Sequence, residues 1–215
     1  MNAAVPEYEG TTRGRAGQEK PLPRHFLEGE RIYLRDVRLA DVGEAYFRWL
    51  NDPEVTQFLE IRYIPHSIED IRRFVEEKNV RPDEIFLAIC LKEGGRHIGN
   101  IKLGPVNRIH RFADISLLIG EKECWGRGYA TEAIAAVARF AFDVQNLNKL
   151  RAGCYSGNRG SEKAFLKVGF SREGCLKNQW MTGGGFQDEI LLGLWRGDWK
   201  DMHHQRNGIP SGASI

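Results

Sequence analysis

The chain has 215 residues, of which 41% are hydrophobic and 28% charged, a composition typical of a soluble globular protein with one sizeable core. Its formal net charge of +2 is too close to neutral to predict a nucleic-acid partner, and no apolar run approaches the length of a membrane span. The N-terminal residues lack the apolar segment of a signal peptide, so we expect a cytoplasmic protein. Reduced, buried thiols rather than disulfides or zinc ligands are expected at the widely spaced cysteines, Cys90, Cys124, Cys154 and Cys175.

Apolar periodicity and capping signals place the expected elements along the chain. Residues 1–26 carry prolines and charges with little apolar pattern, which predicts a disordered tail, and 199–215 are expected to form a second loose tail after a single domain over 27–198. Two helices are expected to begin at capping boxes, Asp41 with Glu44 and Ser67 with Asp70. Strands are expected over 30–37, 85–91, 97–103, 112–119 and 149–155, and a terminal hairpin over 170–180 and 186–194.

The order of these elements is strand, two helices, three strands, helix, strand, helix and hairpin. This order indicates the α+β class with a mixed, twisted sheet. The helix between the last two single strands is expected to leave from Thr131, and its apolar residues recur at helical spacing, so one of its faces packs on the sheet.

The most informative segment is Glu123–Glu132 (ECWGRGYATE), which joins an alternating strand to an Ala-rich helix. Two glycines, Gly126 and Gly128, lie in the connection on either side of Arg127. A strand, a glycine-containing turn and a helix N-terminus together form an anion site, because free backbone N–H groups converge there and the helix dipole favours negative charge. The segment therefore predicts a phosphate-bearing ligand. The alternative is a plain strand-to-helix turn whose glycines serve geometry alone.

Three phosphate-binding patterns compete for this segment. The chain has no Gly-x-x-x-x-Gly-Lys-Ser/Thr run, and the segment lacks the third glycine of a dinucleotide-binding turn, where Thr131 stands instead. The third pattern is Gln/Arg-x-x-Gly-x-Gly/Ala, which Gly128 and Ala130 satisfy while Trp125 departs from the usual first residue.

About 30 residues later, Asn158–Phe170 carries a second pattern, Asn-x-x-Ser followed by Lys-x-Gly-Phe. Gly169 suits the end of a short helix, where positive φ is common. The two motifs in this order resemble the GCN5-related N-acetyltransferase (GNAT) superfamily, and the Trp-Gly-Arg-Gly-Tyr-Ala-Thr-Glu-Ala run resembles its RimJ/RimL-like branch of ribosomal-protein N-terminal, spermidine and amino-sugar acetyltransferases. The resemblance spans roughly residues 30–195.

This resemblance implies the GNAT fold, a central mixed twisted sheet with helices on both faces, and acetyl-CoA as cosubstrate with no metal. It implies that the first motif holds the pyrophosphate and that Asn158 holds the pantetheine arm. The cofactor-binding residues that it implies are Leu118, Ile119, Trp125, Gly126, Arg127, Gly128, Tyr129, Ala130, Thr131, Asn158, Ser161 and Phe165.

Acetyl transfer to an amine needs a donor at the oxyanion and a proton for the departing thiolate. In the family a backbone N–H of the fourth strand is that donor, which implies Leu118 or Ile119 here. Many relatives place a Tyr where this chain has Phe165, which is expected to pack against the acetyl-CoA arm. The resemblance implies Ser161 as the acid, while a helix-capping serine is the alternative.

A base must also take the proton of the amine, directly or through water. The sequence leaves its identity open. Each candidate has a structural alternative; Glu132, for example, also suits the first turn of a helix. The candidates are Asp114, Ser116, His110, Glu132 and Glu173.

The resemblance places the acceptor pocket between the first two helices and the terminal hairpin, with Glu60, Tyr63 and Trp180 as substrate-binding residues. The acceptor is expected to be a primary amine, either of an amino sugar or of a protein N-terminus, with a polyamine third. A non-catalytic acetyl-CoA sensor is the alternative, favoured by the missing Tyr, and a pure interaction module is disfavoured by the two ligand motifs. Edge strands predict a homodimer, and no membrane partner is expected.

Overall fold

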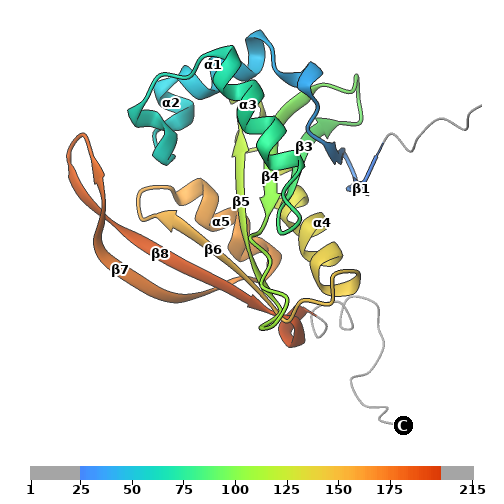
Figure 1. Ribbon diagram of the computed structural model, residues 1–215. Coiled ribbons are helices and arrows are strands. Elements are labelled where there is room, and N and C mark those ends of the chain that lie inside the picture. The colour runs from blue at the N-terminus through green and yellow to red at the C-terminus, as the bar shows by residue number, and fades with distance from the viewer. Residues whose placement is uncertain (1–24, 200–215) are drawn as a thin grey trace, which may run out of the picture.

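The structure is a computed structural model that describes residues 25–199 of the chain (Figure 1). Its centre is an eight-stranded sheet in the order β1-β2-β3-β4-β5-β6-β8-β7. All neighbouring strands pair antiparallel except β5 and β6, which are parallel, so the sheet is mixed as expected. The strands are β1 (Leu27–Glu28), β2 (Ile32–Asp36), β3 (Ile85–Leu91), β4 (His97–Leu103), β5 (Phe112–Ile119), β6 (Lys149–Tyr155), β7 (Ser171–Thr182) and β8 (Gly185–Trp195).

Helices cover both faces of this sheet because apolar side chains alternate along its central strands. On β3, Leu87 and Ile89 belong to the core beneath α4 and α5, whereas Ala88 and Cys90 belong to the smaller core beneath α1 and α3. The α-helices are α1 (Glu44–Asn51), α2 (Pro53–Thr56), α3 (Ile68–Asn79), α4 (Tyr129–Asp143) and α5 (Arg159–Val168), with 3-10 turns η1 (Leu39–Asp41), η2 (Glu60–Tyr63) and η3 (Lys122–Cys124). The predicted fold class is therefore confirmed.

Local capping signals were right for one helix and wrong for another. Ser67 and Asp70 form the predicted capping box at the start of α3. Asp41 does not cap α1, which begins after Gly43. Its carboxylate instead accepts the backbone N–H of Arg38 at 2.7 Å and pairs with Arg35, so it stabilises the turn η1 rather than the start of α1.

Three further expectations differ in detail. Helix α4 begins at Tyr129, two residues before Thr131. All the cysteines are free, but Cys175 on β7 is exposed rather than buried. Trp199 is buried against Phe142, with ring centroids 5.8 Å apart, so the core extends to this residue. The tails expected over 1–26 and 199–215 otherwise lie outside the described residues, apart from residues 25 and 26.

Candidate active site

The parallel pair β5 and β6 separates after its first three residues. Phe112, Ala113 and Asp114 pair with β6, and no later residue of β5 does. On its other side β5 pairs with β4 through Ile119. Strands that are paired on one edge and open on the other present a row of free backbone groups, as an edge strand does. The two strands thus diverge in the middle of the sheet, as β5 and β6 in Figure 1 illustrate.

Strand register decides which backbone groups of β5 face this opening. Gly120 N–H donates to Ile98 and Gly104 N–H to the Asp114 carbonyl, both on the β4 side. Because the direction alternates along an antiparallel pair, Leu118 also turns its backbone N–H toward β4. The N–H groups of Leu117 and Ile119 face the opening instead. Of the two predicted oxyanion donors, only Ile119 has the required direction.

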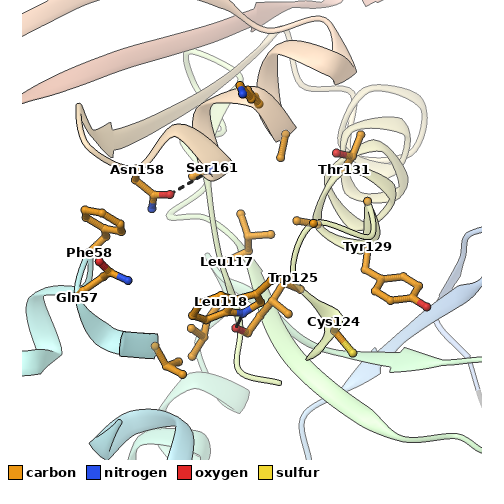
Figure 2. Close-up of a pocket in the computed structure, with 18 of the residues that line it drawn as sticks. Gln57, Phe58, Leu117, Leu118, Cys124, Trp125, Tyr129, Thr131, Asn158 and Ser161 are labelled. Carbon is orange, nitrogen blue, oxygen red and sulfur yellow. Dashed lines mark hydrogen bonds between the residues drawn. The ribbon is translucent and has the colours of Figure 1, made fainter. Parts of the chain in front are cut away.

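A cavity of about 510 Å³ lies over this opening, within the range of small-molecule sites. Figure 2 shows its walls, with Leu117 and Leu118 from β5 at the base, Asn158 and Ser161 on one side and Thr131 on another. Most of the predicted cofactor residues line it, and sequence reasoning missed Leu117, Gln57, Lys163 and Lys167. The predicted residues among its lining are Leu118, Ile119, Trp125, Gly126, Gly128, Tyr129, Ala130, Thr131, Asn158 and Ser161.

One end of the cavity is the predicted anion site. Gly126 and Gly128 have φ of 71° and 85°, a left-handed conformation that favours glycine. Gly128 is the N-cap of α4. From Gly126 to Thr131, no backbone N–H finds an acceptor within the described part of the chain. Six consecutive free N–H groups at the N-terminus of a helix form a strong anion site, and the exposed Lys163 and Lys167 add positive charge.

The loop is held in place from behind by Arg31. Its guanidinium donates to the Arg127 carbonyl at 3.0 Å and lies 4.7 Å from the centre of the Tyr129 ring. Glu132 accepts the backbone N–H of Arg31 at 2.6 Å and that of Ile32 at 3.2 Å. Glu132 therefore joins α4 to the start of β2 and does not line the cavity.

Trp125 stands at the first position of the Gln/Arg-x-x-Gly-x-Gly/Ala pattern. Its indole N–H donates to the Ile119 carbonyl at 2.8 Å, so the ring lies along the end of β5 (Figure 2). The side chain is 37% exposed and lines the cavity. Trp125 therefore occupies the Ile119 carbonyl, one of the unpaired backbone groups of β5, and leaves the Ile119 N–H free.

The first turn of α5 forms the opposite wall. Asn158 is the N-cap, and its Oδ1 accepts the Ser161 backbone N–H at 3.1 Å. The Asn158 amide nitrogen has no partner among the described residues and remains available to a ligand. Because Asn158 caps the helix, the structure gives no capping role to the Ser161 side chain.

Several predicted site residues lie away from the cavity. Phe165 is only 2% exposed and packs on Phe170 at 5.0 Å between ring centroids, so it is a core residue. Arg127 contributes its carbonyl to Arg31 and does not line the cavity. The candidate bases His110, Asp114 and Glu173 do not reach it either: His110 precedes the distal end of β5, Asp114 pairs with Arg151, and Glu173 pairs with Lys149. Ser116 is exposed on β5.

Next to the cavity, the predicted acceptor residues gather around Tyr155 through hydrogen bonds and ring contacts. The Tyr155 hydroxyl donates to Glu60, and Arg62 donates to that hydroxyl at 2.8 Å. Trp180 stacks on the Tyr155 ring at 5.4 Å, and Tyr63 donates to the Met181 carbonyl at 2.5 Å. Burial and the bond to Glu60 raise the pKa of Tyr155 to about 12. The sequence pointed to Glu60, Tyr63 and Trp180, but not to Tyr155 at their centre.

No group of metal-ligating side chains large enough to hold an ion occurs in residues 25–199. Within the same range, no helix combines the length and apolarity that crossing a bilayer needs.

Comparison with known proteins identifies the family. Residues 31–171 match the acetyltransferase (GNAT) domain family. The chain belongs to the GNAT family. It is therefore an N-acetyltransferase, and enzymes of this family use acetyl-CoA.

Relatives of this GNAT protein include the uncharacterized N-acetyltransferase YoaA of Bacillus subtilis, which is 30% identical over 74% of this chain and 90% of its own length. Spermidine N(1)-acetyltransferase of Escherichia coli is 27% identical over 81% of this chain and 87% of its own length. Among solved structures, spermidine N-acetyltransferase from Vibrio cholerae in complex with CoA and spermine superimposes with a TM-score of 0.71 at 20% identity, over 79% of this chain and 98% of that one, which shows the shared GNAT fold.

Proposed function

We propose that this GNAT protein binds acetyl-CoA in the cavity over the opening of β5 and β6, and transfers its acetyl group to a primary amine by direct attack in a ternary complex. The observation that carries the proposal is the run of six backbone N–H groups, Gly126 to Thr131, without acceptors among the described residues, where the cavity meets the N-terminus of α4. Such a run can bind the negative charges of a pyrophosphate. The free edge of β5, which ends at Ile119, lines the same cavity.

The reaction requires that the amine nitrogen form a bond to the thioester carbonyl carbon while the carbon–sulfur bond breaks. The Ile119 N–H faces the opening and is the donor for the oxyanion, an interaction worth about 3 kcal/mol in other enzymes. Ser161 lines the same cavity, and its hydroxyl gives a proton to the departing thiolate and regains one from solvent. Asn158 holds the pantetheine arm through its free amide nitrogen.

The acceptor approaches from the cluster around Tyr155. Phe58 links the two sites, because it lines the cavity and its ring lies 5.8 Å from that of Tyr155. An amino sugar and a protein N-terminal amine remain our proposed acceptors, with a polyamine third. The alternative of a non-catalytic sensor rests on the missing Tyr at residue 165, and the thiol-release assay below separates it from the enzyme.

A thiol-release assay tests the proposal. Purified protein is incubated with acetyl-CoA and an amino sugar, a peptide with a free N-terminus or spermidine, and the same peptide with an acetylated N-terminus serves as the matched control. We expect amine-dependent release of free thiol with one class and none with the blocked peptide. Release at the amine-free rate with every acceptor, together with tight acetyl-CoA binding, would support the sensor instead.

We further propose that the protein forms a homodimer, since the outer strand β7 is long and exposed and presents an unpaired edge. Sedimentation at micromolar concentration should give about twice the chain mass of 24.5 kDa. A sedimentation mass equal to that of one chain would contradict this.

A further inference from the structure

Glu189 on β8 is a carboxylate that the structure leaves without a partner. Its side chain is half-buried, yet it makes no hydrogen bond or ion pair with any described residue. Two other carboxylates on the same face of the sheet are neutralised, Asp114 by Arg151 and Glu173 by Lys149. A half-buried carboxylate without a partner is harder to keep charged than a paired one, which sets Glu189 apart from Asp114 and Glu173.

The backbone beside Glu189 makes room for it. Glu189 is in register with Tyr155 on the neighbouring strand β6. Its carboxylate occupies the position that a Cβ on Gly153 would take, so any side chain at residue 153 would displace it. Gly153 has no left-handed φ that would require glycine for its own conformation. The glycine therefore leaves room for the carboxylate over β6.

This placement borders the opening between β5 and β6. Asp114 is in register with Arg151 where the strands still pair. Counting on from that pair, Gly153 lies across the opening from Ser116, and Tyr155 across from Leu118. Gly153 and Tyr155 point away from α4 and α5, because Ala152 and Cys154 between them belong to the core under those helices. Glu189, whose carboxylate lies over Gly153, is therefore on the face of the sheet opposite to α4 and α5 and beside the opening, although it is not part of the cavity lining.

An acceptor amine has to reach the acetyl carbonyl from this opposite side, since the cosubstrate occupies the side of α4 and α5. The amine enters as an ammonium ion and must lose a proton before it attacks. Burial raises the pKa of Glu189, and the nearby Glu60 carboxylate raises it further. A carboxylate whose pKa is shifted upward is a better proton acceptor than an ordinary one.

We propose that Glu189 is the general base of the reaction and takes the proton of the acceptor ammonium, directly or through one water. This inference rests on the proposed function. One N–H bond of the ammonium breaks and one O–H bond forms on the Glu189 carboxyl, which returns the proton to solvent after the amide product leaves. The neighbouring Glu60 attracts the same cation, and the aromatic rings of Tyr155 and Trp180 form the wall beside it.

The charged and titratable groups on the elements packed against Glu189 define what a pH profile would report. The register partner of Glu189 on β7, Leu176, is apolar. Tyr155 titrates near 12 and Arg62 stays charged, so neither changes state near neutral pH. The titratable or charged groups near Glu189 are therefore Glu60 and Arg62 on η2, and Cys154 and Tyr155 on β6.

The test compares Glu189→Gln with the matched variant Glu173→Gln, which removes a carboxylate from the same face where it is ion-paired. With an acceptor that the wild type uses, we expect Glu189→Gln to lower kcat/KM at least tenfold, to lose the acid limb of the pH profile, and to keep acetyl-CoA affinity within twofold. Glu189→Asp should restore part of the rate. Glu173→Gln should retain the wild-type rate and profile.

A second variant guards against a folding artefact. Gly153→Ala leaves the carboxyl group in the chain but displaces it, so it should lower kcat/KM in the same direction while circular dichroism stays unchanged. A wild-type rate and pH profile in Glu189→Gln would overturn the inference, and so would a rise in KM alone with kcat and the acid limb intact. Inactivity of the wild type toward every amine would instead contradict the proposed function.

Discussion

Asn158 accepts the backbone N–H of Ser161 at its Oδ1, 3.1 Å away, and thereby caps helix α5 in place of the serine. Sequence reasoning left two roles open for Ser161, acid or helix cap. Because the neighbouring Asn158 already satisfies the first turn, the structural alternative for the Ser161 hydroxyl is weakened. The position of Ser161 in the cavity wall agrees with the proposed role as acid.

For Ser161→Ala, we predict a fall in kcat of tenfold or more, equal to about 1.4 kcal/mol, with little change in acetyl-CoA affinity or in the free energy of unfolding. Steady-state kinetics and urea unfolding measure these quantities. The matched variant Asn158→Ala should instead lose about 1 kcal/mol of stability, as removal of an N-cap does. Full turnover in Ser161→Ala with an unaltered pH profile would point to unassisted departure of the thiolate.

Phe165→Tyr is predicted to destabilise the protein rather than to supply a proton donor. The Phe165 ring is 2% exposed and packs on Phe170, so an added hydroxyl would be buried without a hydrogen-bond partner. Such burial costs roughly 1–3 kcal/mol. Thermal unfolding and the activity of the double variant with Ser161→Ala check this. Restoration of turnover in the double variant would mean that residue 165 reaches the thiolate after all.

Gly128→Val should weaken acetyl-CoA binding at least tenfold. Gly128 has φ of 85°, and a Cβ there would lie 3.3 Å from the Arg31 guanidinium, which holds the loop from behind. A branched side chain would strain the turn and disturb the row of N–H groups. Isothermal titration measures the affinity, and circular dichroism checks the fold. Gly183→Val is the control, since a Cβ at residue 183 meets nothing within 4 Å. Equal affinities in both variants would remove the loop from the site.

The partly buried His97 should make the fold sensitive to acid. Its Nε2 donates to the Gly99 carbonyl at 2.9 Å and to Asn100 at 2.8 Å, and its ring lies against Trp49. Burial lowers the pKa of His97 below the ordinary 6.5. Below about 6.5 the unfolded chain binds a proton that the folded one resists, so stability is lost as the pH falls through this value.

Urea unfolding at neutral pH and near pH 5.5 should therefore show a loss of stability in the wild type. The loss should be smaller in His97→Gln, which cannot take up the proton. A pH dependence of equal size in both proteins would assign the acid sensitivity to other groups.

Local signals in the sequence were sufficient for most of the strands, for α3 and for the glycine turn before α4. The Ser67 capping box and the two glycines of the loop act within a few residues, so their patterns alone predicted α3 and the turn before α4. Phe165 was predicted to pack against the acetyl-CoA arm, but it lies in the core. The apolar pattern of its helix indicates this, because Ala164, Phe165 and Val168 share the buried face of α5. The prediction followed the resemblance to the family instead of this apolar pattern.

Long-range register determined the rest of the candidate site. Arg31 meets Glu132 across 101 positions, and Tyr155 meets Glu60 across 95, and no local pattern predicts either pair. Glu189 was missed for the same reason, since its place over Gly153 depends on the pairing of β8 with β6. Residues placed by strand pairing become recognisable only when the sheet order is known.

The most direct test of the account follows an isotopically labelled acetyl group from acetyl-CoA. The protein is incubated with labelled acetyl-CoA, first without and then with the best amine of the panel, and both the amine and the intact protein are weighed by mass spectrometry. Direct transfer predicts that the label appears on the amine nitrogen while the protein mass stays unchanged in both incubations. Label held covalently on the protein, or retained by acetyl-CoA with every amine, would contradict it.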